Sequence, residues 1–163
     1  MLYINQLDYP DMVYHHNMKE GGAGEYNTVK AGGCGPCSLC MLIENMTFDH
    51  LGLEECLAIS ERVKANWDMG TDLKILGPVI ADKYSLKYDI TDDVELLKTW
   101  LARGGMAVAN SGGDREGYTG LLTHGGHYVL VVSYADGEFC ILDPSYTETK
   151  FHEEGREGKV REA

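Results

Sequence analysis

Apolar residues recur at helical spacing in the first two thirds of the chain. Every third or fourth position is apolar in four segments, as in amphipathic helices. These segments are Pro36 to about Met46, Leu53 to about Ala65, Thr71 to about Tyr84, and Asp92 to Ala102. Thr91 or Asp92 offers an N-cap for the fourth helix, and Gly104-Gly105 ends it. Residues 1–33 lack such a pattern and are expected to form an irregular arm.

The last third of the chain changes character. Residues 127–134 (HYVLVVSY) are β-branched and nearly all apolar, which predicts a buried strand. Asp136-Gly137 is a hairpin-turn signal, and residues 138–142 (EFCIL) form the returning strand. The glycine-rich stretch from Gly112 to Gly126 before the hairpin predicts a long loop bordering a cleft. Helices followed by hairpin strands indicate an α+β fold with an antiparallel sheet.

Length and charge restrict the classes of function. The 163 residues suit a single domain covering 1–163. The formal net charge is −12, which disfavours nucleic acid and anionic membrane surfaces as partners. No apolar stretch is long enough for membrane insertion, and the N-terminus lacks a signal-peptide pattern. We therefore expect a cytoplasmic protein, unless a secretory leader has been removed.

The chain has five cysteines, and three of them lie close together at Cys34, Cys37 and Cys40. An odd, crowded set does not suit the disulfide framework of a small secreted domain. It suits a reducing compartment and one or two functional thiols. We expect Cys40, Cys56 and Cys140 to be apolar core residues, and the pair His15-His16 and His124 to be solvated loop residues.

Three residues together suggest nucleophilic catalysis. Cys34 follows two glycines and precedes Gly-Pro and a helical pattern, so its sulfur should lie at a helix N-terminus, which stabilises a thiolate. His127 opens the buried strand, where a general base would be held rigidly. Asp143 ends the returning strand, towards the same open end of the hairpin, and can orient the imidazole. Taken singly, each could instead be a buried turn cysteine, a strand-end histidine or an Asp-Pro turn residue.

These motifs resemble the bacteriocin-processing peptidases that cleave after double-glycine leaders, and their stand-alone relatives in the papain-like clan. The matching runs span nearly the whole chain. They are INQLDYP (4–10), GGCGPCSLCMLI (32–43), LLKTWLARGGMAVA (96–109), GGHYVLVVSYADG (125–137) and FCILDPS (139–145). No transporter or nucleotide-binding segment accompanies them.

The resemblance implies a papain-like cysteine peptidase fold and a Cys-His-Asp thioester mechanism. Cys34 would be the nucleophile, His127 the general base and then acid, and Asp143 the residue that orients His127. Gln6 would supply the side-chain donor of the oxyanion hole, next to the backbone N–H of Cys34. The expected substrate is a peptide or protein amide, cleaved after a small residue. No metal or organic cofactor is needed.

The same cysteines allow other interpretations. The run Cys34-Gly35-Pro36-Cys37 is also a thioredoxin-type motif, so a thiol–disulfide oxidoreductase using Cys34 and Cys37 is the alternative function. The preceding residues do not predict the apolar strand that such a motif needs. A Cys34–Cys37 disulfide could also silence the nucleophile reversibly. Metal binding by Cys34, Cys37 and Cys40, and a non-catalytic binding module on the same fold, are two further alternatives.

Overall fold

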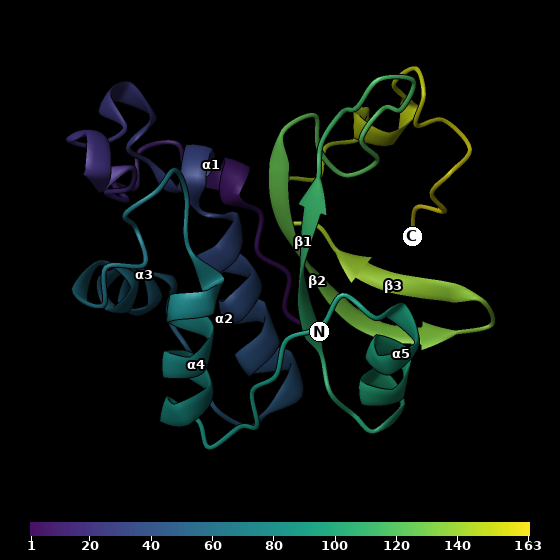
Figure 1. Cartoon of the computed structure of the whole chain (residues 1–163), viewed down its shortest axis with the longest axis horizontal. Coiled ribbons are helices and arrows are strands. Elements are labelled where there is room, and N and C mark those ends of the chain that lie inside the picture. The colour runs from purple at the N-terminus through teal and green to yellow at the C-terminus, as the bar shows by residue number, and fades with distance from the viewer.

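The computed structural model describes residues 1–163 and has five α-helices followed by a three-stranded antiparallel sheet (Figure 1). The predicted α+β class is confirmed, and every predicted helix and hairpin strand is present with bounds shifted by a few residues. The elements are α1 Val29–Gly32, α2 Cys34–Met46, α3 Leu53–Arg62, α4 Leu73–Lys83, α5 Val94–Ala102, β1 Ala107–Gly112, β2 Gly126–Ala135 and β3 Glu138–Leu142. Four 3-10 turns add η1 Gln6–Asp8, η2 Met18–Glu20, η3 Gly24–Tyr26 and η4 Lys150–His152.

The main hydrophobic core lies among α2, α3 and α4. The wholly buried side chains of Ile43, Cys56 and Leu76 come from these three helices, and partly buried Val108 of β1 packs against the cluster. The helices α1 to α4 form one side of the molecule in Figure 1, and the sheet lies beside them. This arrangement brings the N-terminal end of α2 to the same end of the molecule as the start of β2.

The sheet has the order β1-β2-β3, so β2 is its central strand. The predicted turn joins β2 to β3, with φ of 53° at Asp136 and 82° at Gly137. Positive φ at both central residues matches the twist of the two strands, which is why Asp-Gly is favoured there. A β-bulge interrupts the β2–β3 pairing between Val131 and Ser133.

A side-chain cap fixes the start of α5. The Asp93 carboxylate accepts hydrogen bonds from the backbone N–H groups of Glu95 and Leu96, so it is the N-cap of α5. The N-cap predicted at Thr91 or Asp92 is therefore wrong by one or two residues. The Thr91 hydroxyl instead accepts from the backbone N–H of Asp93.

Two predictions about single residues are wrong. His16 is fully buried rather than solvated: its ring contacts the Tyr26 carbonyl through Nε2, and its Nδ1 accepts from the backbone N–H of Gly70. Cys140 is exposed on β3 rather than part of the core, because an edge strand shows one face to solvent. The expectation holds for His15, which is exposed, and for Cys40 and Cys56, which are buried.

The N-terminal arm is more structured than the pattern predicted. It contains η1, η2, η3 and the short helix α1, and its Tyr14 is fully buried. The Tyr14 hydroxyl bonds the hydroxyl groups of Ser60 and Thr71, which ties the arm to the helical core. Across the whole fold, no helix has the length and apolar character needed to cross a bilayer.

Candidate active site

Cys34 is the first residue of α2 and is partly exposed. Gly33 both ends α1 and caps α2, so the chain turns from one helix into the next within one residue. A Cβ at Gly33 would lie 2.6 Å from the carbonyl oxygen of Val29, so this close turn requires glycine. As the first residue of the helix, Cys34 has a backbone N–H without an intrahelical partner, at the positive end of the helix dipole.

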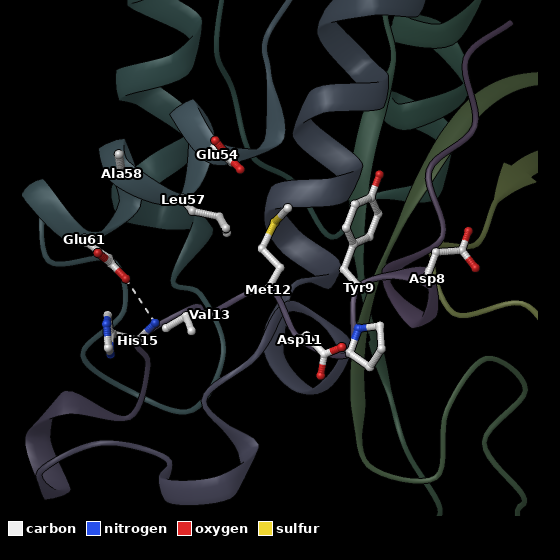
Figure 2. Close-up of a pocket in the computed structure, with 11 residues that line it drawn as sticks. Asp8, Tyr9, Asp11, Met12, Val13, His15, Glu54, Leu57, Ala58 and Glu61 are labelled. Atoms are coloured by element: carbon white, nitrogen blue, oxygen red, sulfur yellow. Dashed lines mark hydrogen bonds between the residues drawn. The ribbon is translucent and has the colours of Figure 1, made fainter.

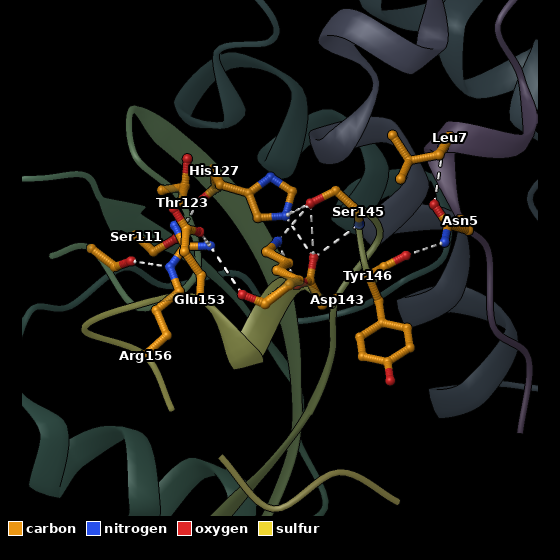
Figure 3. Close-up of polar contacts among 12 residues, drawn as sticks. Asn5, Leu7, Ser111, Thr123, His127, Asp143, Ser145, Tyr146, Glu153 and Arg156 are labelled. Carbon is orange, nitrogen blue, oxygen red and sulfur yellow. Dashed lines mark hydrogen bonds and ion pairs between the residues drawn. The ribbon is translucent and has the colours of Figure 1, made fainter. Parts of the chain in front are cut away.

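His127 lies near the start of β2 and is only 7% exposed. Its Nε2 donates to Oδ1 of Asp143 over 2.7 Å, and Figure 3 shows the other ring nitrogen turned away from this contact. Burial is the largest influence and lowers the pKa of His127, but hydrogen bonds with Asp143 and with Cys34 outweigh it and leave the pKa raised. The imidazole is therefore bonded to a carboxylate through Nε2, and the Cys34 thiol is one of the neighbouring groups that raise its pKa.

Asp143 follows the last residue of β3 and is buried. Burial, the largest influence, raises the pKa of its carboxyl group. Hydrogen bonds from His127, Lys150 and the backbone N–H of Ser145 more than offset this and lower the pKa to about 2. The carboxylate is therefore ionised at neutral pH and can stabilise an imidazolium at His127.

The β-bulge in β2 decides that His127 and Asp143 meet. Beyond the bulge, Leu130 lies opposite Leu142. Continuing that register places His127 opposite Ser145, so Asp143, two residues earlier, shares its face. Between the bulge and the turn, Ala135 lies opposite Glu138. Without the extra residue, that register would place His127 opposite Tyr146 and put Asp143 on the other face.

Gln6 lies in η1 with a buried side chain. Its Nε2 donates to the carbonyl oxygen of Lys30 over 2.8 Å, so the amide is held beside α1, just before Cys34. An amide nitrogen has two hydrogens, and this bond uses one of them. The Oε1 atom is buried without a hydrogen-bond partner. No direct hydrogen bond joins Gln6 to Cys34, so its role as oxyanion donor stays a prediction.

Two residues that the sequence did not single out complete the site. The Ser145 hydroxyl lies 3.0 Å from Nε2 of His127 and 3.2 Å from Oδ1 of Asp143. Lys150 donates from Nζ to Oδ2 of Asp143 over 2.7 Å and to the Ser145 hydroxyl over 2.8 Å. Ser145 could have been noticed as the residue after Asp-Pro, but a single lysine in a charged segment gave no signal.

A hollow of about 500 Å³ opens beside His127, lined mainly by polar residues. Thr123 and His124, from the loop between β1 and β2, form one wall, and Lys150 and Arg156 form another. The predicted loop therefore borders this hollow, which His127 lines and Cys34 does not. Neighbouring His124 is exposed and contacts the carboxylates of Asp114 and Glu153 rather than Asp143. His124 and His127 are thus close in the sequence but have different carboxylate partners.

Cys37 lies one helical turn after Cys34 but differs from it in environment. Its side chain is 0% exposed and packs with Tyr14, Val29 and Leu57. Burial is the largest influence and raises the pKa of the Cys37 thiol far above its usual range. A buried thiol held in its protonated form is a poor partner for disulfide exchange, because the thiolate is the attacking species.

A larger groove lies between the N-terminal arm and α3 (Figure 2). It has a volume of about 700 Å³, and Tyr9, Met12 and Leu57 contribute apolar surface to it. Its acidic residues are Asp8, Asp11, Glu54 and Glu61. It contains no cysteine, and none of the residues predicted to act in catalysis lines it. No group of three or more His, Cys, Asp or Glu side chains in the chain is arranged to hold a metal ion.

Comparison with known proteins gives no match: no protein-family model, no curated protein and no solved structure is similar to this chain. The function must therefore be argued from the site itself.

Proposed function

We propose that the protein is a papain-like cysteine peptidase or a related amide hydrolase. One observation carries the proposal: a buried histidine is bonded to an ionised aspartate, and a partly exposed cysteine at a helix start is one of the neighbours that raise the pKa of that histidine. This is the arrangement of nucleophile, base and orienting group that acyl transfer requires. The resemblance to double-glycine-leader peptidases rests on the same Cys34, His127 and Asp143.

The proposed reaction has two halves. His127 takes the proton of the Cys34 thiol, the sulfur attacks the amide carbonyl carbon to form a C–S bond, and the C–N bond breaks as His127 gives that proton to the leaving amine. His127 then takes a proton from water, which attacks the thioester, and the C–S bond breaks to release a carboxylic acid. The backbone N–H of Cys34 and the Gln6 amide are the proposed donors to the oxyanion.

The surroundings of the two cysteines favour this function over thiol–disulfide exchange. An oxidoreductase would need Cys37 to resolve a mixed disulfide with Cys34. Cys37 is fully buried, whereas His127 is in place beside Cys34 with its own carboxylate. The site therefore has the parts for proton transfer, and its second sulfur is poorly placed for exchange.

Differential alkylation tests the nucleophile, because the chain supplies its own reference thiol. Cys140 is exposed and lies at a distant point on β3, while Cys37, Cys40 and Cys56 are fully buried. Iodoacetamide reacts with the thiolate rather than with the thiol, so a site that stabilises the thiolate gains most at about pH 5.5. We expect Cys34 to react at least about tenfold faster than Cys140 at that pH, and the advantage to shrink near pH 8.5.

Matched variants assign the effect to the proposed base. His127→Ala should abolish the advantage of Cys34 at about pH 5.5, whereas His124→Ala should keep it. Burst hydrolysis of p-nitrophenyl acetate, absent in Cys34→Ala, should then report the acyl-enzyme and its turnover. Equal labelling of Cys34 and Cys140 in the folded protein would overturn the proposal. So would disulfide reductase activity that depends on both Cys34 and Cys37, which would favour the redox alternative.

A further inference from the structure

The two oxygens of the Asp143 carboxylate have different partners. Oδ1 faces His127 and Ser145, and Oδ2 accepts from Lys150 Nζ over 2.7 Å. The Ser145 hydroxyl lies within hydrogen-bond distance of both Lys150 and His127. We propose that Lys150 is a positioning residue, which acts through Asp143 and Ser145 to hold His127 in its working orientation. This inference rests on the proposed function.

The side chain of Lys150 is largely buried beside Asp143. Its side chain is only 10% exposed, whereas those of Lys19 and Lys83, which form surface ion pairs, are more than 40% exposed. Moving an ammonium group out of water costs several kcal/mol unless other groups bond it well. Lysine is thus an expensive residue at this position, and the bonds to Asp143 and Ser145 are what offset the cost.

The backbone that carries Lys150 is fixed by contacts on both sides. Lys150 opens η4, and its backbone N–H donates to the carbonyl oxygen of Thr147. Phe151, the next residue, is buried, and its ring stacks on that of Tyr146 with centroids 6.1 Å apart. The ammonium group is therefore delivered to Asp143 from an ordered turn, η4, that is held on both sides.

The geometry specifies what Lys150 does for Asp143. A carboxylate bonded through one oxygen can rotate, but one bonded through both oxygens is fixed in plane and in orientation. Removing Lys150 would leave Oδ2 buried and unpaired, so the carboxylate could turn away from His127. A carboxylate that is free to turn would stabilise an imidazolium at His127 less, so Cys34 should be alkylated more slowly at acid pH.

The charged and titratable groups around this pair are few. His127 bonds Asp143 through Nε2, and the neighbouring Cys34 thiol also has Cys37 and Tyr128 as titratable neighbours. Asp143 faces His127 and Lys150, and Tyr3 of the N-terminal arm donates from its hydroxyl to the Asp143 carbonyl oxygen. His124, Glu153 and Arg156 line the adjoining hollow. Lys150 is the cation that bonds the carboxylate directly, so its removal should be visible in the pH profile of Cys34.

The test uses Cys140→Ser as the parent, so that Cys34 is the one accessible thiol. The rate of iodoacetamide alkylation is measured against pH for the parent and for Lys150→Met, Lys150→Arg and Lys159→Met. Lys159 is an exposed lysine of the same C-terminal segment and serves as the control. Circular dichroism checks that each variant is folded.

We expect Lys150→Met to raise the acid midpoint of the profile by about one pH unit and to slow alkylation about tenfold near pH 6. Lys150→Arg should stay within about threefold of the parent, because arginine keeps the charge and the donors. Lys159→Met should match the parent. In an Asp143→Asn background, Lys150→Met should cause no further loss, because Lys150 acts through Asp143.

The outcomes separate this inference from the function on which it rests. If the parent shows no acid-shifted reactivity at Cys34, the proposed function fails. If the parent shows this reactivity and folded Lys150→Met has the same pH profile of Cys34 alkylation, only the positioning role fails. An equal loss from Lys150→Met in both backgrounds also overturns that role. Should Lys150→Met not fold, Ser145→Ala removes the bridging hydroxyl. We then expect the rate of Cys34 alkylation to fall about threefold near pH 6. An unchanged rate would contradict the inference.

Discussion

Gln6 and Pro144 are joined by a backbone hydrogen bond of 2.7 Å, from the Gln6 N–H to the Pro144 carbonyl oxygen. This bond ties η1, near the start of the chain, to the residue that follows Asp143. The Gln6 side chain reaches from there to Lys30, four residues before Cys34. One short segment thus links the histidine side of the site to the cysteine side, and Gln6 lies between them.

Gln6→Ala should separate oxyanion stabilisation from thiol reactivity. Alkylation forms no oxyanion, so the rate of Cys34 alkylation should change less than about threefold. Acylation by p-nitrophenyl acetate does form one, and its burst rate should fall by about 10²-fold. Stopped-flow measurement of both rates on the same preparation checks this. Parallel losses in the two reactions would assign Gln6 a purely structural role.

Asp143→Asn should show the pH dependence of stability that its pKa implies. The pKa of the Asp143 carboxyl group falls from 3.8 to about 2 on folding, so ionised Asp143 stabilises the folded state above about pH 4. That contribution is of the order of 2 kcal/mol and is lost as pH falls towards 2. Urea unfolding of the parent and the variant from pH 6 to pH 2.5 should show a difference in unfolding free energy that shrinks below pH 4. A difference that stays constant over this range would contradict the assignment.

Oxidation should inactivate Cys34 without the help of Cys37. Cys37 is buried, and burial raises the pKa of its thiol, so Cys37 is a poor attacking group for an oxidised Cys34. We expect peroxide followed by dithiothreitol to leave the parent and Cys37→Ser with the same recovered alkylation rate at Cys34. Recovery in the parent that is lost in Cys37→Ser would instead support a protective disulfide.

Gly33→Ala should disturb the turn that places Cys34. The added Cβ would lie 2.6 Å from both the Cγ1 and the carbonyl oxygen of Val29, so α1 and α2 would have to move apart. Overpacking of this kind costs about 1–3 kcal/mol, and the reactivity of Cys34 at about pH 5.5 should fall with it. Gly125→Ala is the control, since nothing lies within 4 Å of a Cβ there. Thermal unfolding and alkylation measure the two effects, and equal stability of both variants would be contrary to expectation.

The sequence by itself determined the helices, the hairpin and the main candidates for chemistry. Apolar periodicity is a local signal, and so are the glycines before Cys34 and the Asp136-Gly137 turn. These features placed Cys34 at a helix start and His127 and Asp143 at the same end of a hairpin. The exposure of Cys140 and the burial of His16 were missed, because both depend on which neighbours cover a residue.

The tertiary structure decided how the candidate residues meet. The extra residue of the β2 bulge puts His127 and Asp143 on one face, and a strict alternation pattern cannot show such a shift of register. Lys150 could be recognised only from the folded structure, which brings its ammonium group to Asp143, because nothing in its own sequence marks it as the partner of that residue. Side-chain periodicity is encoded locally, whereas charge pairing between distant segments exists only once the chain has folded.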